Sequence, residues 1–137
     1  MDVSVVEGSC LCGKVRFSLQ PPFETMRHCH CGRCRKGTGT GHATNLLVGM
    51  DQISWLSGED LISRFELSDA KSFGKWFCRC CGSPLPRLSR SGYVVVPSGS
   101  LDTDPGISPS SRIFWDSRVR WSCEGDGLPT HSGYPES

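Results

Sequence analysis

Cysteine constrains this chain more than any other residue type, because it makes up 9 of the 137 residues and most of these cysteines fall into short chelating patterns. An odd number of cysteines cannot all pair as disulfides within one chain. The opening residues, MDVSVVEGSC, lack the features of a signal peptide, so we expect a cytoplasmic protein with reduced thiols. In a reducing compartment, such a density of cysteine favours metal binding over a disulfide framework.

Length and composition predict a single globular domain. A chain of 137 residues with 36% hydrophobic and 21% charged residues is typical of one folded unit. We expect this domain over residues 1–124 and a loosely held C-terminal tail over residues 125–137. The formal net charge of +1 and the lack of a long apolar run argue against nucleic acid or a membrane as partners, and they leave the oligomeric state open.

Short alternating patterns, interrupted by glycine and proline, predict a mostly β domain built from short antiparallel strands. The alternation is clearest over residues 15–19 and 61–67. Further strands are expected over residues 3–6, 28–31, 43–48, 53–56, 75–78, 93–96 and 112–115, with a helical turn over residues 33–37.

Two cysteine pairs, Cys10 with Cys12 and Cys78 with Cys81, make one complete set of four thiolate ligands. Zinc takes four ligands in a tetrahedron, and each short loop with cysteines two or three positions apart can supply two of them. We therefore predict a structural zinc that staples the domain, because this cross-link would close the long segment between the pairs. Either pair taken alone is also compatible with ordinary buried cysteines.

The middle cluster, Cys29, Cys31 and Cys34, has three thiols and no obvious fourth ligand. In an extended stretch Cys29 and Cys31 project to one face, and Cys34 can reach them if the chain turns at Gly32 and Arg33. Three ligands leave one position of a tetrahedral zinc open, which is typical of a catalytic site. The spacing therefore predicts a second zinc, to which a substrate atom can bind.

The other residues near this cluster give weaker signals. Cys80 and Cys123 fit no chelating pattern, so a second structural zinc completed by one of them or by a histidine is equally compatible with the spacing. His28 and His30 flank Cys29 and are expected on the opposite face, as packed or surface histidines.

Basic and aromatic side chains could border an open site. Three cations that follow the cluster could attract an anionic substrate or form a solvated edge; they are Arg33, Arg35 and Lys36. Three aromatic residues are expected in the core or in a pocket wall; they are Phe114, Trp115 and Trp121.

Four motifs occur in order along the chain, GSCLCGKV at 8–15, CHCGRCRK at 29–36, FCRCCGSPL at 77–85 and GSLD at 99–102. Together they resemble the glutathione-dependent formaldehyde-activating enzyme family, over residues 4–121. The resemblance implies a β-tent type zinc fold with two zinc ions per chain. It implies a structural ion on Cys10, Cys12, Cys78 and Cys81 and a catalytic ion on Cys29, Cys31 and Cys34. This partition agrees with the one that the cysteine spacing predicts.

The activity that this resemblance implies is that of a zinc-dependent carbon–sulfur lyase. It would join a thiol, glutathione, to a small aldehyde, formaldehyde, giving S-(hydroxymethyl)glutathione. Cys29, Cys31 and Cys34 would be the catalytic residues, holding the zinc that binds the thiol sulfur.

Two other hypotheses come from related domains. The resemblance extends to centromere protein V, which implies a non-enzymatic zinc-binding module for a protein partner. A methionine sulfoxide reductase B would need Cys123 as its reactive cysteine, yet the surrounding sequence, WSCE at 121–124, lacks the expected motif.

Overall fold

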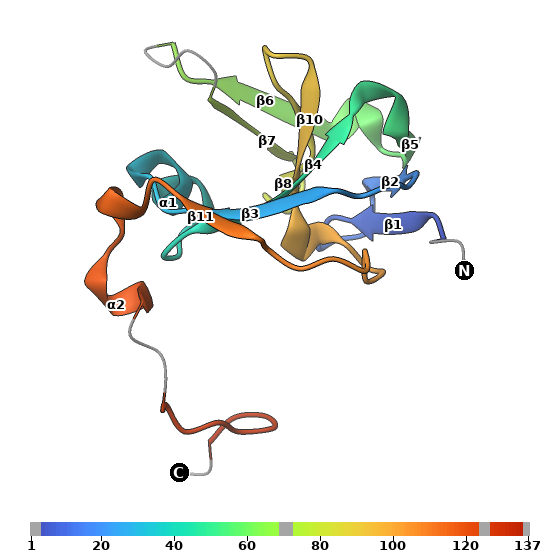
Figure 1. The fold of residues 1–137 in the computed structure, drawn as a ribbon. Coiled ribbons are helices and arrows are strands. Elements are labelled where there is room, and N and C mark those ends of the chain that lie inside the picture. Colours follow the sequence, from blue (N-terminus) through green and yellow to red (C-terminus); the bar gives the residue numbers. More distant parts are fainter. Residues whose placement is uncertain (1–3, 69–72, 124–126, 136–137) are drawn as a thin grey trace.

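The computed structural model describes residues 4–68, 73–123 and 127–135. Over these residues the chain forms three small sheets joined by turns and short helices (Figure 1). The helical elements are α1 (Gly32–Thr38), α2 (Arg120–Cys123) and the 3-10 turns η1 (Met50–Gln52), η2 (Glu59–Leu61), η3 (Ser98–Ser100) and η4 (Trp115–Ser117). None of the helices in the described ranges has the length and apolarity needed to cross a membrane.

The largest sheet carries the site and has five strands. Their order is β11 (Ser111–Ile113), β3 (Thr25–Cys29), β4 (Ala43–Gly49), β10 (Tyr93–Pro97) and β9 (Arg87–Leu88). The two smaller sheets contain β1 (Val6–Ser9), β2 (Arg16–Leu19) and β5 (Ile53–Ser57), and β6 (Ile62–Glu66), β7 (Gly74–Cys78) and β8 (Pro84–Leu85). Adjacent strands pair antiparallel except β11, which runs parallel to β3. The predicted mostly β fold of short antiparallel strands is confirmed.

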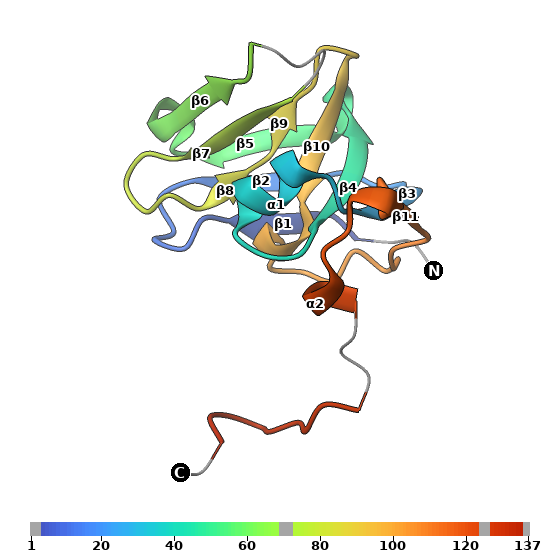
Figure 2. The same ribbon diagram turned by 90° about the vertical axis from the view of Figure 1, so that its left-hand side faces the viewer.

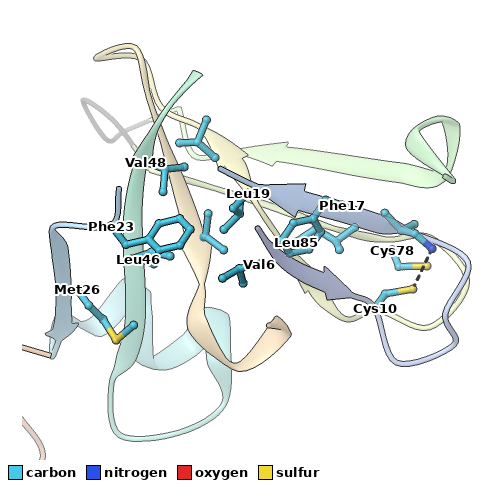
Figure 3. Packing of buried hydrophobic residues seen from close by; sticks show 13 residues of the cluster. Val6, Cys10, Phe17, Leu19, Phe23, Met26, Leu46, Val48, Cys78 and Leu85 are labelled. Carbon is cyan, nitrogen blue, oxygen red and sulfur yellow. Dashed lines mark hydrogen bonds between the residues drawn. The ribbon is translucent and has the colours of Figure 1, made fainter. Parts of the chain in front are cut away.

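One cluster of buried side chains draws residues from all three sheets (Figure 3). Phe17 of β2 and Leu46 of β4 belong to it and are 0% exposed. A Cβ atom at Gly8 of β1 would collide with the Phe17 ring, so only glycine allows this close approach. Cys10 and Cys78 belong to the same cluster and lie at the end next to Phe17 (Figure 3).

Most predicted strands occur within one or two residues of their expected bounds, and three differ. The strand expected over residues 28–31 ends at Cys29, because Cys31 is the N-cap of α1 and accepts a hydrogen bond from the Cys34 N–H. The strand expected over residues 112–115 ends at Ile113, because Phe114 adopts the left-handed conformation with φ 54°. The strand expected over residues 3–6 is displaced: residue 3 lies outside the described residues, residues 4 and 5 are not in a strand, and β1 runs over Val6–Ser9.

The C-terminal part of the described chain leaves the sheets. The helix α2 lies outside the sheets, where Ser122 comes close to Gly41. Residues 127–135 are exposed and lie away from the sheets in Figure 1. The expected boundary between domain and tail, at residues 124 and 125, lies outside the described residues, so its position stays a prediction.

Candidate functional site

Two turns bring together the sulfur atoms of Cys10, Cys12, Cys78 and Cys81, the group that we call the cysteine quartet. All four atoms lie within 4.8 Å of one another. Cys12 Sγ lies 3.5 Å from Cys10 Sγ and 3.8 Å from Cys78 Sγ. Sulfur ligands at about 2.3 Å from a tetrahedral zinc lie about 3.8 Å from one another. The quartet could therefore hold a tetrahedral metal ion.

A glycine in the left-handed conformation shapes each turn of the quartet. Gly13 has φ 80° and Gly82 has φ 77°, a region that glycine enters without a steric penalty. Their N–H groups donate to the carbonyl of the first cysteine of each pair, at 3.0 and 2.7 Å. Ser83 joins the two turns, since its Oγ accepts a hydrogen bond of 2.9 Å from the Leu11 N–H. The local sequence thus presents each pair of sulfur atoms in one direction.

The environment of the quartet distributes its protons unevenly. The hydrogen bond between Cys81 and the Ser83 hydroxyl, supported by backbone N–H groups, lowers the pKa of Cys81 to about 5. Burial raises the pKa of Cys78, which is 0% exposed. An ion bound by all four thiolates would have to displace the protons that remain.

A second group, which we call the cysteine trio, lies where β3 ends and α1 begins. The sulfur atoms of Cys29, Cys31 and Cys34 lie within 4.8 Å of one another. Cys29 is the last residue of β3, and the Sγ of the cap residue Cys31 accepts the Cys34 N–H at 3.3 Å. In the part of the chain that the structure describes, no further histidine, cysteine, aspartate or glutamate joins this group. The trio could therefore hold a metal ion with three donors from the described chain.

The trio has a small apolar surrounding of its own, separate from the main core. Cys29 lies opposite Ala43 of β4 and beside Ile113 of β11. Ala43 is buried with the cysteines, and Ile113 and Phe73 pack against them. These neighbours shield one side of the sulfur group from water.

Hydrogen bonding within the trio separates the acidities of its thiols. A hydrogen bond from the Cys34 thiol lowers the pKa of Cys29 to about 6, against the opposing effect of burial, and the charge of Arg27 contributes a little. The same hydrogen bond and burial raise the pKa of Cys34. Cys29 therefore ionises more readily than Cys34, and a cation bound to the trio would favour the thiolate form of its ligands.

Three residues that the sequence analysis considered as possible ligands, Cys80, His28 and His30, lie outside both sulfur groups. A fourth, Cys123, has a side chain that the structure does not describe. Cys80 is exposed, with its Sγ 3.9 Å from Lys14 Nζ. His30 is packed, being 2% exposed, and its ring lies 5.0 Å from that of Trp115. A hydrogen bond of 2.8 Å joins Nδ1 of His28 to the Thr44 hydroxyl.

The basic and aromatic candidates occupy mixed positions. Arg33 and Lys36 are exposed, whereas the Nε atom of Arg35 is buried without a hydrogen-bond partner in the described chain. Phe114 and Trp121 are 63% and 68% exposed, so the prediction of a core position was wrong for both. The physical reason is that β11 ends at Ile113 and the chain then leaves the sheet.

Sequence reasoning missed the residues that distant segments bring to the trio. Phe73 and Ile113 are ordinary apolar residues with no motif, and only strand pairing places them there. It also missed a pocket of about 550 Å³ next to β11, although Trp115 was expected in a pocket wall. The pocket is lined by His28, Pro109, Ser110, Ser111, Arg112 and Trp115.

Comparisons with known proteins identify the family of the chain. The family model of the glutathione-dependent formaldehyde-activating enzyme matches residues 5–117. A Halomonas elongata protein, named provisionally as a glutathione-dependent formaldehyde-activating enzyme, is 36% identical over 146 residues, which cover 96% of this chain and 90% of that protein. A crystal structure of a Rhodobacter sphaeroides protein shares the fold, with a TM-score of 0.60 at 22% identity, covering 77% of this chain and 98% of that one. By the family match and the Halomonas relative, the chain belongs to the glutathione-dependent formaldehyde-activating enzyme family.

Proposed function

We propose that the protein is a zinc-dependent carbon–sulfur lyase that joins glutathione to formaldehyde at the cysteine trio. The observation that carries the proposal is a set of three converging sulfur donors with no fourth ligand in the described chain. The family and the name of the Halomonas relative support glutathione and formaldehyde as the substrates. The free thiols suit a reducing compartment, so we also propose a cytoplasmic location.

In this proposal each sulfur group holds one zinc ion, the quartet a structural ion and the trio a catalytic ion. At the trio, zinc would supply a Lewis-acidic position at which a substrate thiol is held as its thiolate. The chain's part is to fix the donors before the substrate arrives. The N-cap hydrogen bond holds Cys31 against Cys34, and Ile113 and Phe73 cover the apolar side. Donors held in this way need little rearrangement during the reaction.

The proposed reaction balances without an oxidant or a reductant. The thiol sulfur forms a bond to the aldehyde carbon, the carbonyl π bond opens, and the proton of the thiol ends on the former carbonyl oxygen. Holding the two reactants together makes the addition effectively unimolecular, which can supply several kcal/mol of the barrier reduction. Positioning the sulfur is therefore the main contribution that the trio would make.

The alternative, a non-enzymatic module for a protein partner, has one observation in its favour. Phe114 and Trp121 expose aromatic rings close to each other in the sequence, as an interaction surface could. Against it stands the trio itself, since a purely structural ion is expected to have four protein ligands. Within the described chain the trio has three.

The experiment that tests the lyase proposal is exchange NMR. Zinc-loaded protein is mixed with glutathione and formaldehyde, and exchange between free glutathione and the adduct is followed. We expect the wild-type protein to accelerate exchange and Cys31→Ser to lose the acceleration, while Cys80→Ser keeps it as the matched control. Exchange at the uncatalysed rate with fully loaded wild-type protein would contradict the lyase proposal and favour the binding module.

A further inference from the structure

The pocket next to β11 has no role in the proposed chemistry so far, yet it lies beside the trio. Arg112 pairs with His28, and the next pair along the two strands is Ile113 with Cys29. Figures 1 and 2 both show β11 alongside β3. One lining residue of the pocket, His28, therefore directly precedes Cys29, a ligand of the proposed catalytic zinc.

The lining of this pocket is cationic and rich in hydroxyl groups. Arg112 is part of the lining, and its guanidinium lies 5.3 Å from the centre of the Trp115 ring. The Arg118 guanidinium lies 4.3 Å from the same ring, although Arg118 is not itself a lining residue. No carboxylate lines the pocket, and neither guanidinium forms an ion pair within the described ranges. Ser110 and Ser111 add two hydroxyl groups. This combination of donors suits an anion.

Two histidines lie at this pocket: His28 is part of its lining, and His30 contacts one of its walls. The Nδ1 atom of His28 is hydrogen-bonded to the Thr44 hydroxyl at 2.8 Å. His30 is 2% exposed, and neither of its ring nitrogens has a hydrogen-bond partner in the described chain. Its ring contacts Trp115, a wall of the pocket. Buried polar groups are normally hydrogen-bonded, so the ring nitrogens of His30 remain able to bond to a ligand or a water molecule.

Among anions, a carboxylate fits these donors well. A guanidinium presents parallel N–H groups that match the two oxygen atoms of a carboxylate, and serine hydroxyls can donate to the same oxygens. Glutathione carries carboxylates at both of its ends. His28 and Cys29 face opposite sides of β3, but β11 is the edge strand of its sheet, so a flexible peptide can pass around it.

We propose that this pocket binds a carboxylate of the thiol substrate, and that Arg112 selects thiols with a carboxylate over neutral thiols. The inference rests on the proposed function, because it assumes that the substrate sulfur lies at the trio. Arg112 is exposed and would act as a specificity residue that contacts the substrate away from the reacting atoms.

The test uses S-methylglutathione, which keeps both carboxylates but has no thiol to ionise. Its binding to the zinc-loaded protein is measured by titration calorimetry, which requires no catalytic activity. We expect Arg112→Gln to weaken binding at least about tenfold, as for the loss of a hydrogen bond to a charged group. Arg112→Lys, which keeps the charge but loses the planar fork, should lie between the two.

Arg64→Gln is the matched control, because the Arg64 guanidinium also lies over a tryptophan, 4.4 Å from the Trp76 ring centre, but outside the pocket. We expect it to bind S-methylglutathione as the wild type does. Esterifying both carboxylates should weaken binding to the wild type and remove the effect of Arg112→Gln.

Two results would overturn the inference: no binding of S-methylglutathione to the wild-type protein, or equal affinity of the wild type and Arg112→Gln. Failure of the proposed function gives a different pattern. S-methylglutathione would still bind in an Arg112-dependent way, but the wild type would not accelerate exchange with formaldehyde.

Discussion

The quartet and the trio use the same ligand type but differ in where their sulfur atoms come from. The quartet joins segments whose contacting cysteines lie 66 positions apart, and Cys10 and Cys78 are part of the main core. The trio comes from one strand end and the helix that follows, with a small apolar cluster of its own. An ion at the quartet would close a long loop, whereas an ion at the trio would close a short one.

Under the proposed roles, sequence separation rather than ligand chemistry distinguishes the structural from the reactive cysteine site. Four donors from two segments complete a coordination sphere and order the chain between them. Three donors from one local segment order little beyond themselves and leave a side for another molecule. Each of the following predictions can break this comparison or make it sharper.

The largest effect is expected from removing a quartet ligand. Cys10→Ser should prevent stable folding, because the apparent binding free energy of a structural zinc, about 10 kcal/mol or more, is comparable to the whole stability of a domain. Circular dichroism and native mass spectrometry of the purified variant measure the fold and the metal content. Cys80→Ser is the control and should match the wild type. A Cys10→Ser protein with wild-type melting temperature would refute the structural role of the quartet.

Removing a trio ligand should leave the fold and remove the chemistry. Cys29→Ser, which like Cys10→Ser replaces a buried cysteine, is expected to cost about 2 kcal/mol of stability or less. It should lose one metal ion per chain and slow adduct exchange at least about 100-fold, since the Lewis-acidic position is lost. Thermal unfolding, native mass spectrometry and exchange NMR check the three effects. If Cys29→Ser unfolds as Cys10→Ser does, the two groups do not differ as we argue.

A chelator should distinguish the two groups in the unmodified protein. An ion with three protein ligands offers the chelator an open side, so we expect one equivalent of zinc to leave first with the fold intact. The second equivalent should leave slowly and together with unfolding. A chromogenic chelator and circular dichroism, recorded in parallel, follow both events. Cys29→Ser should show only the slow phase, and a single phase in the wild type would count against the distinction.

The smallest effect is expected at Ser83, next to the quartet. Ser83→Ala removes the hydroxyl that accepts the Leu11 N–H and stabilises the Cys81 thiolate, so stability should fall by about 1 kcal/mol. The pKa of Cys81 in the metal-free protein should rise from about 5, because a thiolate that loses a hydrogen-bond donor is protonated more easily. Zinc binding at the quartet should then need a higher pH. Ultraviolet thiolate absorbance against pH measures the change, with the exposed Ser91→Ala as control.

Much of the fold followed from local patterns in the sequence. The alternation over residues 43–48 and 93–96 predicts the strands found at β4 and β10, because one face of each is buried. The end of the strand predicted over residues 28–31 was wrong, because an alternating pattern cannot show that the Cys31 sulfur caps a helix. The core positions predicted for Phe114 and Trp121 were wrong for a similar reason. Phe114 adopts the left-handed conformation that ends β11, and this conformation is normally recognised in a sequence by a glycine.

The sequence by itself determined which cysteines lie together within each pair and within the trio, because their turns involve only neighbouring residues. Tertiary structure decided that the two cysteine pairs meet and that Phe73 and Ile113 pack against the trio. It also decided that Arg112 lines a pocket next to β11. These placements depend on which strands pair and in what register. That choice minimises the free energy of the whole core, so no single segment of the sequence encodes it.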